Sequence, residues 1–163
     1  MAATPLTDVP NVFPVDTNEL PTIGILSQQI SDDLKADPRL EGYDSYMMAA
    51  YVTFMESAGA RVVPLILGEP LENTMDKLSK IDGVLFPGGS GDYYEFGKPI
   101  WDEILRQNDA GNVFPAWGTC LGFETMGQWA ADEPFDLWGK FSAHSISQTI
   151  EFTVDPASTR MFG

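Results

Sequence analysis

The sequence predicts an α/β fold, with helices on both faces of a doubly wound and mostly parallel sheet. Short apolar runs rich in β-branched residues alternate with longer segments whose apolar residues recur at helical spacing. The alternation of strand and helix repeats four times, which is typical of a parallel sheet covered by helices. Hydrophobic residues make up 44% of the 163 residues and charged residues 20%, so the chain can bury a core.

The alternation starts after a polar segment. Residues 1–20 contain prolines that break regular structure, and we expect an extended N-terminal arm there. Residues 22–26 are apolar and partly β-branched, which predicts a buried strand. Residues 28–42 are polar and charged, which predicts a loop.

A helix is predicted next, with Asp44 or Ser45 as its N-cap. Apolar residues recur at helical spacing over residues 47–58. Gly59 follows at the position where a glycine ends a helix.

A second strand is predicted over residues 61–67, where Pro64 indicates an irregular or exposed stretch. The remaining elements follow the same alternation: a helix over 72–80, a strand over 83–86, a tight turn over 87–91, a helix over 99–109, a strand over 113–117 and a helix over 122–131. Residues 136–153 predict irregular chain with one or two strands. We therefore expect a domain over residues 21–163 that is incomplete at its C-terminus.

Right-handed crossovers between these strands give a flavodoxin-like order, in which ligands bind beyond the carboxyl ends of the strands. Cys120 lies there, in the pattern Gly-x-Cys-x-Gly of residues 118–122. This is the nucleophile-elbow pattern with cysteine as the nucleophile, and the helix that follows favours a thiolate with its positive end. A small buried hydrophobe is the alternative for a lone cysteine, but the change from strand to helix favours the nucleophile.

The turn after the third strand carries Gly88 and Gly89. An acyl-transfer nucleophile needs backbone N–H groups that hold the oxyanion, and glycines let the backbone come close. Leu121 directly follows the cysteine, and we expect its backbone N–H to be a second donor. Taken alone, the turn is also consistent with an ordinary connection between strand and helix.

The sequence contains one histidine, His144, which has no acidic residue two positions after it. We interpret it as a surface or edge-strand histidine more readily than as the catalytic base. One cysteine and one histidine form neither a disulfide nor a metal cluster, and no phosphate-binding or dinucleotide glycine pattern occurs, so no cofactor is expected.

The charge is strongly acidic, with 24 acidic against 9 basic residues and a formal net charge of −15. Such a surface repels nucleic acids and anionic membranes, so neither is expected as a partner. The sequence shows no apolar run that would span a bilayer, and its N-terminus does not have the pattern of a signal peptide.

Several blocks in order resemble the γ-glutamyl hydrolases of the class I glutamine amidotransferase-like group. They are residues 21–26, 46–52, 56–64, 82–90, 117–124 and 158–162. The block Trp117 to Glu124 is the most specific of them.

This resemblance implies a cysteine peptidase that cleaves γ-linked glutamate from folate polyglutamates through a thioester. By position, Cys120 would be the nucleophile, Leu121 with Gly88 or Gly89 the oxyanion hole, and Tyr46 and Glu124 substrate-binding residues. The family's histidine lies in a downstream Trp-His-Pro-Glu block that this sequence does not contain, so we expect the base to come from outside it. The family also implies a lysosomal, vacuolar or extracellular location.

Two alternatives remain open. The chain could be an inactive homologue that serves as a structural or binding subunit of a larger assembly, with a homodimer or another partner covering its open sheet edge. A glutaminase that passes ammonia to a partner enzyme is the second.

Overall fold

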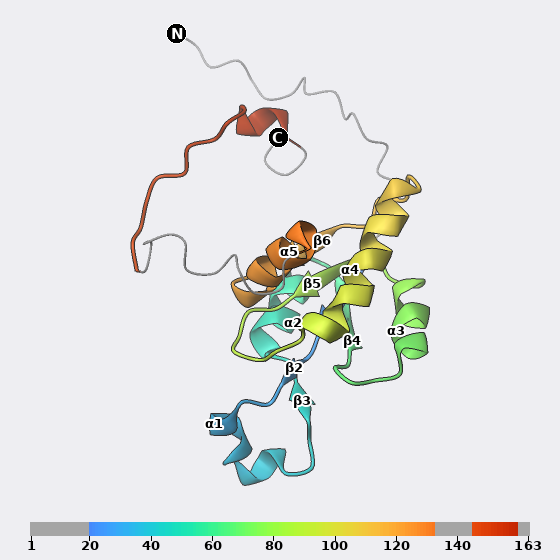
Figure 1. Ribbon diagram of the computed structural model, residues 1–163, viewed down its shortest axis with the longest axis vertical. Coiled ribbons are helices and arrows are strands. Elements are labelled where there is room, and N and C mark those ends of the chain that lie inside the picture. Colours follow the sequence, from blue (N-terminus) through green and yellow to red (C-terminus); the bar gives the residue numbers. More distant parts are fainter. Residues whose placement is uncertain (1–19, 133–144, 160–163) are drawn as a thin grey trace.

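A computed structural model describes residues 20–132 and 145–159 (Figure 1). Its central sheet contains four parallel strands in the order β4-β1-β5-β6. These are β1 (Thr22–Leu26), β4 (Arg61–Leu65), β5 (Gly83–Phe86) and β6 (Ala116–Gly118). The parallel sheet with flanking helices confirms the predicted fold class. The N-terminal arm expected over residues 1–20 lies outside the described residues apart from Leu20.

Pro64 occupies an edge of this sheet. It pairs with Ile25 of β1, and β4 has no other neighbour among the described strands. A proline has no N–H to give to a ladder and is therefore tolerated on an edge strand.

The helices connect the strands as expected, although several boundaries differ. They are α1 (Asp32–Lys35), α2 (Ala49–Ser57), α3 (Leu71–Leu78), α4 (Tyr94–Asp109) and α5 (Leu121–Ala131), with 3₁₀ turns at Pro38–Leu40 and Pro156–Ser158. Figure 1 shows α2 behind the sheet and α4 in front of it. Gly59 ends α2 with a φ of 86°, as predicted.

The predicted cap of α2 was wrong. Ser45 lies in β3 (Ser45–Tyr46), which pairs antiparallel with β2 (Gln28–Gln29), so the stretch of 28–42 is not a simple loop. The helix begins at Ala49, and its N-cap, Met48, makes no side-chain hydrogen bond. Ser45 therefore pairs with a strand and does not cap the helix.

The start of α4 was also wrong. Pro99 was expected near the first turn, yet the helix begins at Tyr94 and Pro99 lies inside it. Asp92 accepts the Tyr94 N–H at 3.0 Å, which starts the helix earlier. The strand expected over residues 113–117 is shorter and lies at 116–118, and among the described residues 145–153 no strand forms.

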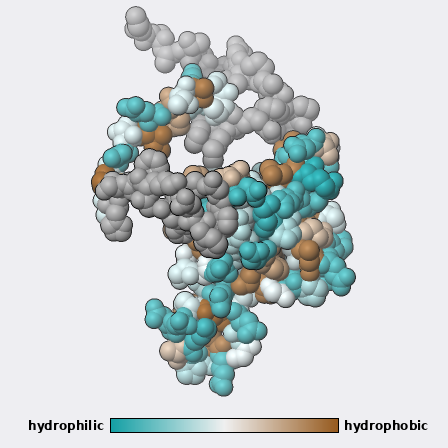
Figure 2. All heavy atoms as spheres, viewed as in Figure 1, coloured by the Kyte–Doolittle hydropathy of each residue, from teal (hydrophilic) through white to brown (hydrophobic). Residues whose placement is uncertain are grey.

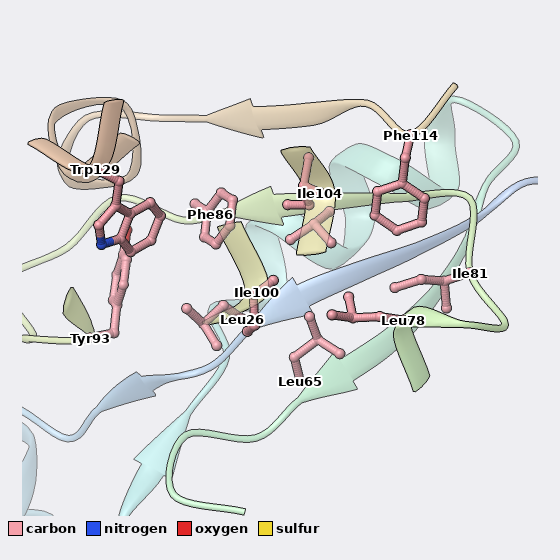
Figure 3. Close-up of a cluster of buried hydrophobic side chains, with 11 residues drawn as sticks. Leu26, Leu65, Leu78, Ile81, Phe86, Tyr93, Ile100, Ile104, Phe114 and Trp129 are labelled. Atoms are coloured by element: carbon pink, nitrogen blue, oxygen red, sulfur yellow. The ribbon is translucent and has the colours of Figure 1, made fainter. Parts of the chain in front are cut away.

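The core lies between the sheet and helices α3, α4 and α5. Phe86 of β5 meets Trp129 of α5 edge to face, with ring centroids 5.1 Å apart (Figure 3). Trp101 of α4 stacks on the same indole at 6.0 Å. Ile25 and Leu85 are also fully buried and point to the opposite face of the sheet, since side chains alternate along a strand. The ring contacts hold β5, α4 and α5 together at the edge where the candidate site lies.

The outer surface over α4 is mostly hydrophilic (Figure 2). It carries exposed ion pairs such as Lys98 with Asp102 and Arg106 with Glu103. None of the helices in the described ranges is long and apolar enough to cross a membrane.

Candidate active site

Cys120 lies in a strained turn between β6 and α5. Its φ is 51° and its ψ is −115°, a conformation that non-glycine residues rarely adopt. A residue in such a conformation costs on the order of 1–3 kcal/mol, and strained residues concentrate at functional sites. The turn leaves the cysteine side chain exposed.

Glycines on both sides of the cysteine let the strand and the helix pass closely. A Cβ on Gly122 would overlap the Phe86 carbonyl oxygen of β5. A Cβ on Gly118 would lie 2.6 Å from the Phe123 nitrogen in the first turn of α5. The backbone at both positions therefore requires glycine, as the elbow pattern implies.

The start of α5 faces the cysteine. Leu121 is the first residue of this 11-residue helix, where an N–H group has no acceptor within the helix. The positive end of the helix dipole favours negative charge at this place. The elbow thus offers an exposed sulfur beside a backbone donor.

Three side chains hold the turn that follows β5. Gln28 Nε2 donates to the Gly88 carbonyl at 2.8 Å and to the Pro87 carbonyl at 3.3 Å. Tyr93 Oη donates to the same Pro87 carbonyl at 2.9 Å. The Gly88 N–H donates to Tyr51 Oη at 2.8 Å.

The two turns touch each other. A Cβ on Gly88 would lie 2.9 Å from the Cβ of Cys120 and 3.1 Å from the Thr119 carbonyl oxygen. The Thr119 N–H donates to the Phe86 carbonyl at 3.1 Å, which ties the elbow to the end of β5. The glycine turn and the cysteine are consequently neighbours in one site.

A cavity of about 490 Å³ opens between the glycine turn and α5. It is lined by residues 89–94 together with Cys120, Leu121, Glu124, Thr125 and Gln128. Glu124 is exposed and lies one helical turn after the cysteine. The structure therefore brings together Gly88, Gly89, Cys120, Leu121 and Glu124.

Tyr46 lies elsewhere. It belongs to β3, pairs with Gln28 and lines a second cavity of about 380 Å³ with residues such as Asp44 and Ile66. The Cys120 cavity does not include it. Its connection to the candidate site is indirect, through the backbone of Gln28.

Three residues of the site were missed by sequence reasoning: Gln28, Tyr51 and Tyr93. Tyr93 is 3% exposed, and this burial raises the pKa of its hydroxyl well above the ordinary value, with smaller contributions from Tyr51, Cys120 and Glu124. A hydrogen bond with Thr125 acts in the opposite direction on the same pKa. The hydroxyl of Tyr93 therefore stays protonated and acts as a donor to Pro87.

A histidine partner for Cys120 is not found among the described residues. His144, the one histidine of the sequence, lies outside them. The described site consequently contains a candidate nucleophile and candidate oxyanion donors without an identified base.

The chain is similar to known proteins over most of its length. The sequence profile of the Peptidase C26 family matches residues 21–130. The chain is 38% identical over 142 residues to γ-glutamyl hydrolase B of Dictyostelium discoideum and 39% identical over 138 residues to γ-glutamyl hydrolase 1 of Arabidopsis thaliana. It is 35% identical over 153 residues to the human γ-glutamyl hydrolase.

These matches cover most of this chain but less than half of each relative. They include 83%, 83% and 90% of this chain, and 40%, 39% and 46% of the three relatives in the same order. The chain therefore spans about two fifths of the length of the relatives it matches.

Proposed function

Since the chain belongs to the Peptidase C26 family, we propose that it carries the nucleophile half of a γ-glutamyl hydrolase site, with Cys120 as the nucleophile. The observation that carries this proposal is the strained and exposed position of Cys120 beside Gly88, at the mouth of a cavity. A buried structural cysteine would need neither the strain nor the exposure.

The proposed reaction begins when the Cys120 thiolate attacks the γ-carbonyl carbon of a γ-linked glutamate. A C–S bond forms and the carbonyl electrons move to the oxygen, which accepts hydrogen bonds from the Leu121 N–H and from the glycine turn. Collapse of this intermediate breaks the C–N bond and releases the amine with a proton. Water then hydrolyses the thioester.

The finer substrate assignment rests on the family resemblance. We propose folate polyglutamates, in which γ-linked glutamates follow one another. A cavity of about 490 Å³ is of the size that holds a small ligand, and Glu124 on its wall is proposed to contact the substrate. A lysosomal, vacuolar or extracellular location is proposed on the same resemblance.

The base is proposed to come from a histidine outside these 163 residues. The chain spans about two fifths of its relatives, and nothing near His144 in the sequence orients it as a base. The chain alone should then show no turnover of a γ-glutamyl amide, because the leaving amine needs a proton. Robust turnover that is lost in His144→Ala would contradict this and assign the base to His144.

Acylation can be tested without a base. In N-acetyl-glutamate γ-p-nitrophenyl ester the leaving group departs as p-nitrophenolate and needs no proton. We expect a burst of p-nitrophenolate that approaches one equivalent per chain, and a much slower reaction with the α-linked isomer. Cys120→Ala should abolish the burst, and a burst that survives this change would refute the proposal.

The alternative role as a subunit of a larger assembly is favoured by one observation. β6 is an edge of the described sheet, and its Trp117 is 44% exposed, so another chain could pair with this strand. A folded chain that is monomeric in analytical ultracentrifugation would exclude a homodimer, and acylation at Cys120 would exclude an inactive homologue.

A further inference from the structure

We propose that Gln28 is a positioning residue, whose side-chain amide fixes the Gly88–Gly89 peptide so that the Gly89 N–H serves as the oxyanion donor of the turn. This inference rests on the proposed function, because it assigns a donor for the intermediate formed at Cys120. It concerns a side chain that lies 60 residues before the turn in the sequence.

In the first peptide group of the turn, between Pro87 and Gly88, the carbonyl and the N–H both have hydrogen-bond partners. Its carbonyl accepts from Tyr93 Oη at 2.9 Å and from Gln28 Nε2 at 3.3 Å. Its N–H, on Gly88, donates to Tyr51 Oη at 2.8 Å. The Gly88 N–H is therefore already engaged by a protein acceptor.

In the second peptide group, between Gly88 and Gly89, only the carbonyl has a hydrogen-bond partner among the described residues. Its carbonyl accepts from Gln28 Nε2 at 2.8 Å, whereas the Gly89 N–H makes no hydrogen bond to any residue that the structure describes. In a trans peptide the N–H points opposite to the carbonyl, so the Gly89 N–H points away from Gln28. Gly89 lines the cavity together with Cys120 and Leu121.

Gln28 is held firmly enough to impose this orientation. It is 2% exposed, lies in β2 and pairs with Tyr46 of β3. The two N–H bonds of its amide match two carbonyl acceptors, Pro87 and Gly88. If the Gly88–Gly89 peptide flipped, its N–H would face the amide donor, and a buried donor would lose its acceptor.

The same geometry requires a glutamine rather than a glutamate. A carboxylate at residue 28 would face two carbonyl oxygens and repel them, and it would attract the Gly89 N–H instead. The flipped peptide would withdraw the N–H from Cys120. The Gln28 amide also lies so close to Gly89 that a Cβ there would overlap it.

The test compares two reactions of Cys120 in the full 163-residue chain. Acylation by N-acetyl-glutamate γ-p-nitrophenyl ester forms an oxyanion, whereas alkylation by iodoacetamide displaces iodide and forms none. We expect Gln28→Glu to slow acylation by about 100-fold at about pH 8, the loss seen when an oxyanion donor is removed, with alkylation unchanged. Gln28→Met, which keeps the length without a donor, should slow acylation by about 10-fold.

A pH series separates positioning from general damage to the fold. In Gln28→Glu the protonated carboxyl regains an O–H donor for the Gly88 carbonyl, and burial beside carbonyl oxygens raises the pKa of this carboxyl above its ordinary value of about 4.3. The ratio of acylation to alkylation in Gln28→Glu should therefore rise toward the wild-type ratio as the pH falls. The ratio in Gln28→Met should stay low throughout.

Gln29→Glu is the matched control, because it adds the same charge to the same strand on an exposed residue. Its acylation rate should equal that of the wild type. The inference is overturned if Gln28→Glu keeps the wild-type ratio, if both of its reactions slow together, or if Gln29→Glu has the same effect. Failure of the wild type to be acylated would instead overturn the proposed function.

Discussion

Two turns meet at the carboxyl edge of the sheet, and they are built in different ways. The elbow over residues 118–122 is fixed by its own sequence, through two glycines that permit close packing and a helix that starts directly after Cys120. The turn of Pro87, Gly88 and Gly89 is fixed by side chains from other elements, chiefly Gln28 and Tyr51. A local motif can therefore identify the candidate nucleophile, whereas the proposed oxyanion side depends on contacts that only the fold creates.

Substitution of Gly122 should disrupt the elbow more than any other change described below. In Gly122→Ala the new Cβ would meet the Phe86 carbonyl oxygen, so α5 must shift away from β5. We expect a loss of about 3 kcal/mol in the free energy of unfolding, at the upper end for overpacking a core. Urea unfolding followed by circular dichroism measures it.

Gly127→Ala is the matched control in the same helix. No atom lies within 4 Å of a Cβ built there, and alanine is the better helix former. This variant should gain about 0.5–1 kcal/mol. Equal effects of the two substitutions would contradict the close packing of the elbow against β5.

Substitution of Gly88 should disrupt the contact between the two turns. In Gly88→Ala the Cβ would lie 2.8 Å from Tyr51 Oη and 2.9 Å from the Cys120 Cβ. We expect about 2 kcal/mol of destabilisation and a clear loss of acylation, because the turn must move away from the cysteine. An acylation rate equal to that of the wild type would show that the glycine turn does not contribute to the reaction.

Tyr93 donates one hydrogen bond to the glycine turn, so removing its hydroxyl should have a smaller effect. Tyr93→Phe removes the O–H donor to Pro87, which keeps its weaker bond from Gln28, and we expect a cost of about 1 kcal/mol in the free energy of unfolding.

Since the folded chain raises the pKa of Tyr93, the stability that this group contributes is present below its ordinary pKa of about 10 and is lost as the pH rises above it. The difference in unfolding free energy between wild type and Tyr93→Phe should therefore shrink above about pH 10. A difference that stays constant with pH would contradict the buried donor.

A substitution remote from both turns serves as the reference for the effects on unfolding free energy and acylation. Asp76 and Lys80 form an ion pair on α3 and the residues after it, with both side chains about two-thirds exposed. Lys80→Ala should change the unfolding free energy by less than about 0.5 kcal/mol and leave acylation unaltered. A large effect on acylation would mean that the reaction does not depend specifically on the two turns.

The sequence was sufficient to predict the parts of this molecule that depend on local patterns. Apolar runs predicted the four strands of the sheet, and the Gly-x-Cys-x-Gly pattern predicted the change from strand to helix at Cys120. The positions of Gln28 and Tyr51 could not be predicted, because nothing in a polar loop or an amphipathic helix indicates which distant carbonyl its side chain will meet. The predicted start of α2 was wrong for the same reason, since Ser45 pairs with a strand instead of capping a helix.

We propose that the elbow and the glycine turn together support acylation of Cys120. The most direct test of this proposal is peptide mass mapping of the chain after a brief reaction with N-acetyl-glutamate γ-p-nitrophenyl ester. We expect one N-acetyl-glutamyl group per chain, in thioester linkage on the peptide that contains Cys120. Label spread over lysines and tyrosines, with Cys120 unmodified in a folded chain, would contradict it.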